Sequence, residues 1–447
     1  MANRIKIKKG LQIPLLGKPE KVLRGNVTSE FVHVWPEDYQ GITPRLSVKV
    51  DDTVKAGQAL FHSKMYPEML FTSPVSGTVV AINRGAKRRI LNIVVKADKE
   101  VEYVEFGKKD IAKLSTDEVK KSLLESGLWG FIKQRPYDIV ANPTSEPRDI
   151  FVTGFDSSPL ATSYDFVLEG READLQSGFD ALAKLTKGKV FLGISPETTN
   201  KGLKGAKNVT ITEFDGPHPA GNVGVHINHL APVNKGEVVW TLNAIDVALI
   251  GRLFNEGKVD MTRKIALAGS EVKQTGYYNM LIGTELKGLV KGNVNEGSLR
   301  YISGNVLTGT KVASDGALRA THSQVTVIPE GDDVHEFIGW ASLSPNRYSS
   351  GSTYLKLKKA YRLDARVMGG PRAIIVSNEY EKVFPMDIMP EQLIKSTIAF
   401  NIDKMEQLGI YEVAPEDFAL CEFVDTSKLE IQKIIRIGLD ELRKEME

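Results

Sequence analysis

The sequence predicts a multidomain protein with α/β and β domains. Its 447 residues exceed what one ordinary core accommodates, so we expect three or four domains. Valine-rich segments divided by turns occupy residues 41–97, and apolar segments alternate with amphipathic ones over 101–260. Helical periodicity returns after Pro390. These observations predict a small β domain, a Rossmann-like parallel sheet and a C-terminal helical piece.

Residues 41–97 contain the segments expected to form the small β domain. We expect strands over 46–50, 54–61 and 71–82, with turns at Asp51-Asp52 and Gly85. The pattern resembles the barrel-sandwich hybrid of biotinyl and lipoyl carrier domains. A carrier exposes a lysine on a tight hairpin, and Lys64 is the one candidate. Because Tyr66-Pro67-Glu68 follows it and Ser73-Pro74 lies too far away, we favour a plain scaffold.

Residues 101–260 have the spacing of strand–helix–strand units. A helix is predicted from Asp110 to Ser126, ended by Gly127. The apolar segments 149–154 and 189–194 each lead into a glycine loop, and 173–187 between them has helical periodicity. This order predicts a βαβ unit in a parallel sheet. A further helix is expected over 246–255.

The rest of the chain returns to strands and then to helices. Strands are predicted over 264–269, 299–304 and 323–328, and helices over 391–408 and 428–444. The predicted domains are therefore 1–100, 101–260, 261–375 with a linker, and 376–447.

Composition excludes several classes of protein. The formal net charge of +2 gives no general attraction to nucleic acid, and the clusters at 4–9 and 87–89 are expected to be mainly solvated faces. A single cysteine, Cys421, excludes intramolecular disulfides and cysteine-ligated clusters within the chain. With no signal-like start and no run of about 18 apolar residues, we expect a cytosolic protein, or one held by partners on the cytosolic face of a membrane.

The densest motif is the segment from Phe214 to His226. Its glycines and prolines disfavour a helix interior or a central strand, so a structured loop built for a specific contact is expected. The functional candidates within it are Gly216, Pro217, His218, Pro219, Gly221, Asn222, Gly224 and His226. His218, His226 and His229, with Glu213 or Asp215, offer a zinc alternative, but backbone-bonded histidines without a metal are favoured.

Standard catalytic and nucleotide motifs are missing from the sequence. The loops after 149–154 and 189–194 lack Gly-x-Gly-x-x-Gly, the 216–224 glycines do not form a P-loop, and no Gly-x-Ser-x-Gly occurs. Cys421 has the apolar neighbours of a core residue. No catalytic residue is assigned.

Several segments, in addition to the 214–226 loop, are similar to the A subunit of the sodium-translocating NADH:quinone oxidoreductase (Na⁺-NQR) family. They are 5–11, 71–77, 82–88, 125–129, 232–234, 300–310 and 419–424. The resemblance implies a barrel-sandwich domain, a Rossmann-like domain, a ubiquitin-like β-grasp domain and a C-terminal helical domain. It implies a peripheral cytoplasmic component of a membrane complex that oxidises NADH, reduces ubiquinone and exports Na⁺. FAD, FMN and the 2Fe–2S centre are expected on partner subunits.

Departures from related electron-input subunits suggest that this chain carries no redox cofactor of its own. The flavin-binding relatives place a glycine- and arginine-rich loop after Ser126-Gly127-Leu128, where this sequence has Trp129-Gly130-Phe131. The alternative is a self-contained flavin- and NADH-binding subunit of complex I or Rnf type. Quinone contact is the ligand hypothesis, because aromatic groups beside hydrogen-bond donors suit a quinone ring. The candidates are Trp129, Phe131 and Arg135, or Phe31, His33 and Trp35.

Overall fold

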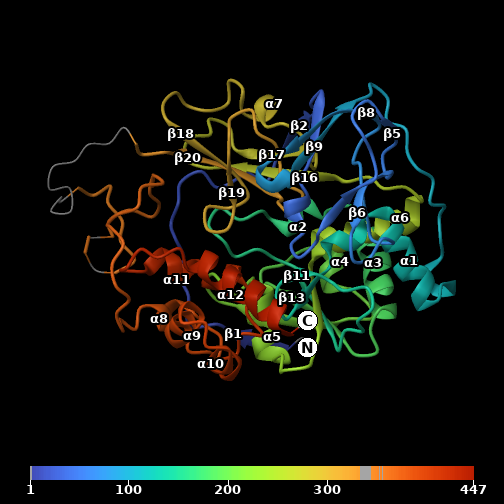
Figure 1. The fold of residues 1–447 in the computed structure, drawn as a ribbon. Coiled ribbons are helices and arrows are strands. Elements are labelled where there is room, and N and C mark those ends of the chain that lie inside the picture. Colours follow the sequence, from blue (N-terminus) through green and yellow to red (C-terminus); the bar gives the residue numbers. More distant parts are fainter. Residues whose placement is uncertain (1–2, 333–343, 352, 355, 447) are drawn as a thin grey trace.

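Four β-sheets and a helical C-terminal part make up the computed structural model, which describes residues 3–332, 344–351, 353–354 and 356–446 (Figure 1). The predicted fold class is confirmed: two small sheets form the barrel-sandwich part, a mostly parallel sheet carries helices, and a mixed sheet follows. The predicted domain boundaries stay predictions.

The barrel-sandwich part pairs a four-stranded sheet with a three-stranded one. Their orders are β3 (Phe31–Val34)-β9 (Ile90–Ala97)-β8 (Gly77–Arg84)-β5 (Thr53–Val54) and β4 (Pro44–Leu46)-β6 (Ala59–Ser63)-β7 (Leu70–Thr72). Phe61 and Phe71 stack at 4.6 Å between ring centroids in the core. The predicted strand 46–50 is wrong, because β4 ends at Leu46 and Asp51 turns the chain at φ 72°. The predicted strand 54–61 is interrupted by a turn at Gly57, whose φ is 89°.

The Rossmann-like sheet has seven strands. Its order is β1 (Asn3–Lys6)-β14 (Thr210–Asp215)-β13 (Val190–Ile194)-β12 (Ile150–Thr153)-β15 (Val239–Asn243)-β10 (Lys133–Arg135)-β11 (Ile139–Val140). The first five strands are parallel, which confirms the predicted βαβ unit, and the last two are antiparallel.

The helices of this part confirm most of the expected segments. They are α1 (Thr116–Ser126), α2 (Tyr164–Val167), α3 (Glu172–Lys184), α4 (Lys201–Lys204), α5 (Val223–Leu230) and α6 (Ala244–Glu256). The predicted helix 110–126 begins later, because Ser115 and Glu118 form a capping box. Gly127 ends it in the left-handed conformation, as expected, at φ 80°.

The mixed sheet receives its outer strand from the chain's N-terminal region. Its order is β19 (Thr310–Val312)-β18 (Leu299–Ser303)-β20 (Gln324–Pro329)-β16 (Thr262–Ala268)-β17 (Gly276–Leu281)-β2 (Leu23–Val27), with the short helix α7 (Lys287–Val290) beside it. All three predicted strands are present. The first 27 residues therefore contribute β1 to one large sheet and β2 to another, ahead of the barrel-sandwich strands.

The C-terminal part contains α8 (Tyr380–Val383), α9 (Pro390–Ile398), α10 (Ile402–Gln407), α11 (Ala419–Val424) and α12 (Ile431–Met446). The predicted helix 391–408 is wrong. Phe400 has φ 50°, and Asn401 starts a new helix by accepting a hydrogen bond from the Lys404 N–H, so the chain forms two helices. Helix α12 fulfils the prediction for 428–444. Apolar residues of these helices share a core with Ile7, Ile139 and Phe214 of the Rossmann-like part.

Candidate functional site

A cavity lies where the strand order of the Rossmann-like sheet reverses. From β12 the chain continues to β13 and β14 on one side, whereas β15 pairs with the other side of β12. Parallel sheets bind ligands in the crevice outside the carboxyl ends of their strands at such a reversal. Here a cavity of about 380 Å³ is lined by Thr153 at the end of β12 and by Thr241, Leu242 and Asn243 at the end of β15.

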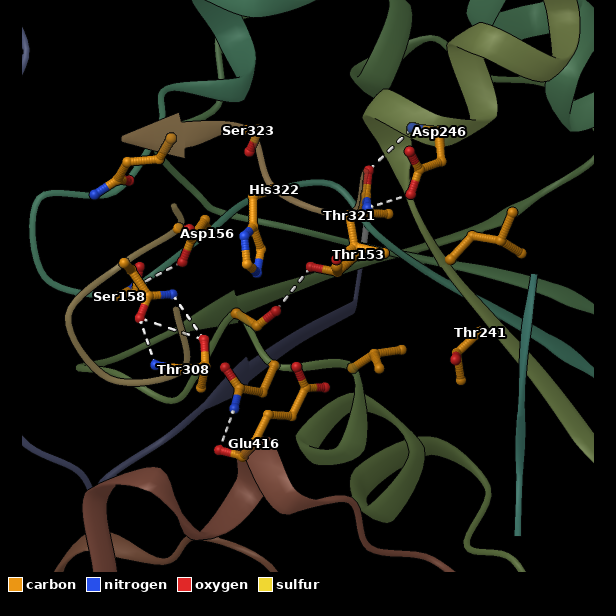
Figure 2. Close-up of a pocket in the computed structure, with 18 of the residues that line it drawn as sticks. Thr153, Asp156, Ser158, Thr241, Asp246, Thr308, Thr321, His322, Ser323 and Glu416 are labelled. Atoms are coloured by element: carbon orange, nitrogen blue, oxygen red, sulfur yellow. Dashed lines mark hydrogen bonds between the residues drawn. The ribbon is translucent and has the colours of Figure 1, made fainter. Parts of the chain in front are cut away.

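Three parts of the fold enclose this cavity, as Figure 2 shows. The Rossmann-like part supplies the strand ends together with Asp156, Ser158 and Asp246. The mixed sheet supplies Arg263 and two loops that carry Thr308, His322 and Ser323, and the C-terminal part adds Glu416 and Gln432. A ligand bound here would contact all three parts, so its binding depends on how the three parts are positioned relative to one another.

The glycine–proline loop forms one wall of the cavity. It is shorter than predicted: β14 includes Phe214 and Asp215, and α5 begins at Val223, so Gly224 and His226 are helical. Gly216 packs so close to β1 that an added Cβ would lie 2.3 Å from the Ile7 carbonyl oxygen. The Ser157 hydroxyl accepts a hydrogen bond from the Gly221 N–H at 2.8 Å, and the Thr153 hydroxyl donates to the Gly221 carbonyl at 2.8 Å. The loop is held rigidly, and His218, Gly221, Asn222 and Val223 face the cavity.

The two histidines within the loop, His218 and His226, are buried and neutral. Burial lowers the pKa of His218 and of His226 to about 4. His226 Nε2 donates to the Ala220 carbonyl at 2.9 Å, and its ring stacks on Phe214 with 4.0 Å between centroids. His229 Nδ1 lies 2.9 Å from the Val225 carbonyl. Among the described residues, no group of three or more His, Cys, Asp or Glu side chains is placed to hold a metal.

Charged side chains surround the cavity, and most of them are paired. Arg263 lies 2.8 Å from Asp246, and its guanidinium covers the Phe131 ring at 5.0 Å. Burial raises the pKa of Asp246, which Arg263 partly offsets. Burial also raises the pKa of Asp156 and of Glu416, and it raises that of the neighbouring Asp417 to about 7. A carboxyl with a raised pKa keeps its proton to a higher pH than a free carboxyl does.

Some buried polar atoms around the cavity make no hydrogen bond to any described residue. Ser158 Oγ, Arg263 Nε and Gln324 Oε1 belong to residues that are nearly inaccessible and that line the cavity. A buried donor or acceptor without a partner costs about 1–3 kcal/mol, so such atoms suit a polar ligand or ordered water. The residues that line the cavity therefore include two donors and an acceptor without partners among the described residues, together with the rings of Phe131, Phe155 and Tyr164.

The six residues suggested for quinone contact fall into two separate places. Trp129 is fully buried, donates to the Ala141 carbonyl at 2.8 Å and packs edge-on against Trp240. Arg135 is also fully buried, at 2.5 Å from Asp138 and 3.7 Å from Glu416. Of this first trio, only Phe131 lines the cavity.

The second trio lies on β3 and just after it, away from the cavity lining. His33 stacks on Trp35 with 5.5 Å between centroids, and its Nε2 lies 3.4 Å from Glu285. Arg319 covers the Trp35 ring at 4.7 Å and forms ion pairs with Glu37 and Asp38. Phe31 is half-buried. These contacts join the barrel-sandwich part to the mixed sheet.

Sequence reasoning missed most of the cavity's polar residues, including Ser158, Asp246, Arg263 and Glu416. They come from segments far apart in the chain, and no local motif joins them. One signal was available: Asn243 caps α6, with Asp246 three residues later, directly after the buried apolar segment that forms β15. That spacing places a carboxylate at the carboxyl end of a parallel strand.

Comparison with known proteins identifies the family. Three family models match: the NqrA N-terminal barrel-sandwich hybrid domain over residues 5–98, the NqrA second alpha/beta domain over 114–259 and the NQRA C-terminal domain over 264–314. The chain belongs to the NqrA family. It is 38% identical to the A subunit of the Na(+)-translocating NADH-quinone reductase of Serratia proteamaculans, over 99% of this chain and 100% of that protein.

Other family members give the same result. The corresponding reductase proteins of Neisseria meningitidis and Haemophilus influenzae are each 37% identical, over 99% of this chain and their whole lengths. A solved NAD⁺-reducing [NiFe]-hydrogenase is similar at a TM-score of 0.38 and 12% identity, over 75% of this chain and 62% of that one, too weak a likeness to argue from. Within the described residues, no helix has the length and apolar character needed to cross a bilayer.

Proposed function

We propose that this chain acts as the NqrA component of a sodium-translocating NADH:quinone reductase, on the cytoplasmic side of the membrane. The observation that carries this proposal is the full-length similarity to proteins of that kind. In the proposed complex, NADH is oxidised, ubiquinone is reduced to ubiquinol and Na⁺ is exported. FAD, FMN and the 2Fe–2S centre reside on partner subunits, chiefly membrane-embedded ones, and this chain organises those partners.

Affinity purification of the tagged chain from gently solubilised membranes tests this role. We expect integral membrane subunits to co-purify, together with NADH:quinone reductase activity. Recovery of the chain alone with a bound flavin would contradict the proposal and favour the self-contained electron-transfer alternative.

We further propose that the quinone head group contacts the cavity at the end of β12 and β15. Phe131 supplies an aromatic wall, and Ser158 Oγ and Arg263 Nε are buried donors on cavity-lining residues that make no hydrogen bond to a described residue. The two carbonyl oxygens of a quinone accept hydrogen bonds, so they complement these donors.

The Ser158→Ala variant tests this placement in the intact complex. Removing one hydrogen bond to the substrate costs about 1 kcal/mol, so we expect the KM for quinone to rise about fivefold at an unchanged kcat. Ser195→Ala is the matched control, because Ser195 follows the neighbouring strand β13 and does not line the cavity. Equal KM values for wild type and Ser158→Ala would contradict the placement.

A further inference from the structure

The segment after the mixed sheet carries a concentrated group of exposed apolar side chains. Val367 and Met368 are 70% and 54% exposed, and Ile375 and Val376 are 61% and 66% exposed. Side chains of this size are ordinarily scattered singly on a protein surface, so four within ten residues indicate a contact surface. In Figure 1 this orange segment lies at the left margin of the molecule, outside the sheets.

This segment, which we call the 366–376 loop, is anchored at both ends. The Ala365 N–H donates to the Pro329 carbonyl at the end of β20, at 3.1 Å. The Arg372 N–H donates to the Ser427 carbonyl at 2.9 Å, and the Ser427 hydroxyl donates to the Ala373 carbonyl at 3.0 Å. Between these anchors, Val367 and Met368 precede two glycines, and an added Cβ on Gly370 would meet nothing within 4 Å. The apolar pair is therefore presented by a fixed loop.

The charges around the loop are basic. Lys356, Lys358, Lys359, Arg362, Arg366 and Arg372 precede or lie within it, and Asp364 is the one acid between 356 and 376. Lys428 lies beside Gly369, since an added Cβ there would be 3.4 Å from its side chain. Arg372 and Lys428 make no ion pair with any residue in the described ranges, whereas Arg366 is paired with Asp364 at 2.8 Å. Unpaired cations thus flank the exposed apolar pairs.

We infer that the 366–376 loop seats this chain on an anionic lipid bilayer. Apolar side chains that protrude between lysines and arginines suit the bilayer interface, where the apolar groups enter the acyl boundary and the cations meet lipid phosphates. An acidic protein surface would satisfy the cations, but it requires a cleft for Val367 and Met368, which stand out at a loop tip. This inference adds a lipid contact to the proposed role in the reductase.

A fluorescent label at the loop tip tests the contact with the purified full-length chain. The chain's single cysteine, Cys421, is buried, so Val367→Cys can be labelled selectively with an environment-sensitive dye. Phosphatidylcholine vesicles containing phosphatidylglycerol are expected to shift its emission to the blue, and added salt to reverse the shift. Met65→Cys, at an equally exposed apolar residue of the barrel-sandwich part, is the matched control and should not shift.

Co-sedimentation with the same vesicles gives the affinity. We expect the double variant Val367→Asp with Met368→Asp to bind about tenfold more weakly than wild type, and Arg372→Ala with Lys428→Ala to lose the preference for phosphatidylglycerol. Circular dichroism melting checks that the exposed substitutions leave the fold intact.

Two outcomes would overturn the inference. One is vesicle binding that the aspartate variant leaves unchanged. The other is an unshifted label in vesicles, combined with loss of a co-purifying protein from the aspartate variant, which would assign the loop to a protein partner. In the second outcome the proposed role in the reductase would stand while the lipid contact would not.

Discussion

His226 illustrates how a single buried residue supports the cavity wall without lining the cavity. Its ring lies between Phe214 and Phe155, with centroid distances of 4.0 and 5.9 Å, and its Nε2–H is used by the Ala220 carbonyl. An added Cβ on Gly193 would lie 2.4 Å from this ring, so β13 needs glycine there. The imidazole therefore acts as a neutral packing group that fixes the glycine–proline loop.

The neutral state of His226 leads to a pH-dependent prediction. Its pKa is lowered to about 4 in the folded chain, so between pH 6.5 and 4 the unfolded chain binds a proton that the folded chain does not. Acidification through this range therefore removes stability, by about 2 kcal/mol at pH 5 from this residue.

The His226→Gln variant isolates this effect, because it does not titrate. We expect wild type to be more stable than His226→Gln at pH 7, and the difference in unfolding free energy to shrink by about 2 kcal/mol at pH 5. Urea unfolding at both pH values measures it. A difference that stays constant from pH 7 to 5 would show that His226 accepts a proton in the folded chain.

At the scale of elements, helices α3 and α6 pack at unusually close range. Gly178 of α3 faces the Val247 carbonyl, where an added Cβ would lie 2.1 Å away, and Gly251 of α6 faces the Asp174 carbonyl at 1.7 Å. Glycine in a helix interior lowers helix stability by about 1 kcal/mol relative to alanine. Both helices carry glycine here because a larger residue would block the close contact. The contact sets the position of α6, whose first turn carries Asp246 into the cavity.

The Gly251→Ala variant tests this helix contact. Although alanine favours the helix, the clash with backbone forces α3 and α6 apart, and we expect a net destabilisation of about 2 kcal/mol. Gly370→Ala serves as the control, because its added Cβ would meet nothing within 4 Å. Thermal unfolding of both variants measures the loss of stability of each relative to wild type. A Gly251→Ala variant as stable as wild type would mean that the helices shift without penalty.

Elements with a strong local pattern could be predicted from sequence. Strands β12 and β13 are short apolar segments, and α3 between them shows helical periodicity, so all three were found. Elements fixed by distant partners could not: β1 forms because it pairs with β14, more than 200 residues away. The break at Phe400 was also missed, although Asn401 before Ile402 has the pattern of a helix start.

At the scale of the whole molecule, the N-terminal region connects separate sheets. Strand β1 completes one edge of the Rossmann-like sheet and β2 one edge of the mixed sheet, while the chain from β3 through β9 builds the barrel-sandwich part. The cavity lies where the Rossmann-like, mixed-sheet and C-terminal parts meet. Its other lining residues depend on this assembly, which explains why the glycine–proline motif revealed only one wall of the site.

The central claim is that this chain is a working part of a sodium-dependent quinone reductase. The most direct measurement is NADH:quinone reductase activity, with and without Na⁺, in membranes from the source organism that lack this chain. The account predicts that activity stimulated by Na⁺ is lost in those membranes and returns when the chain is expressed again. Sodium-stimulated activity that persists without the chain would contradict the account.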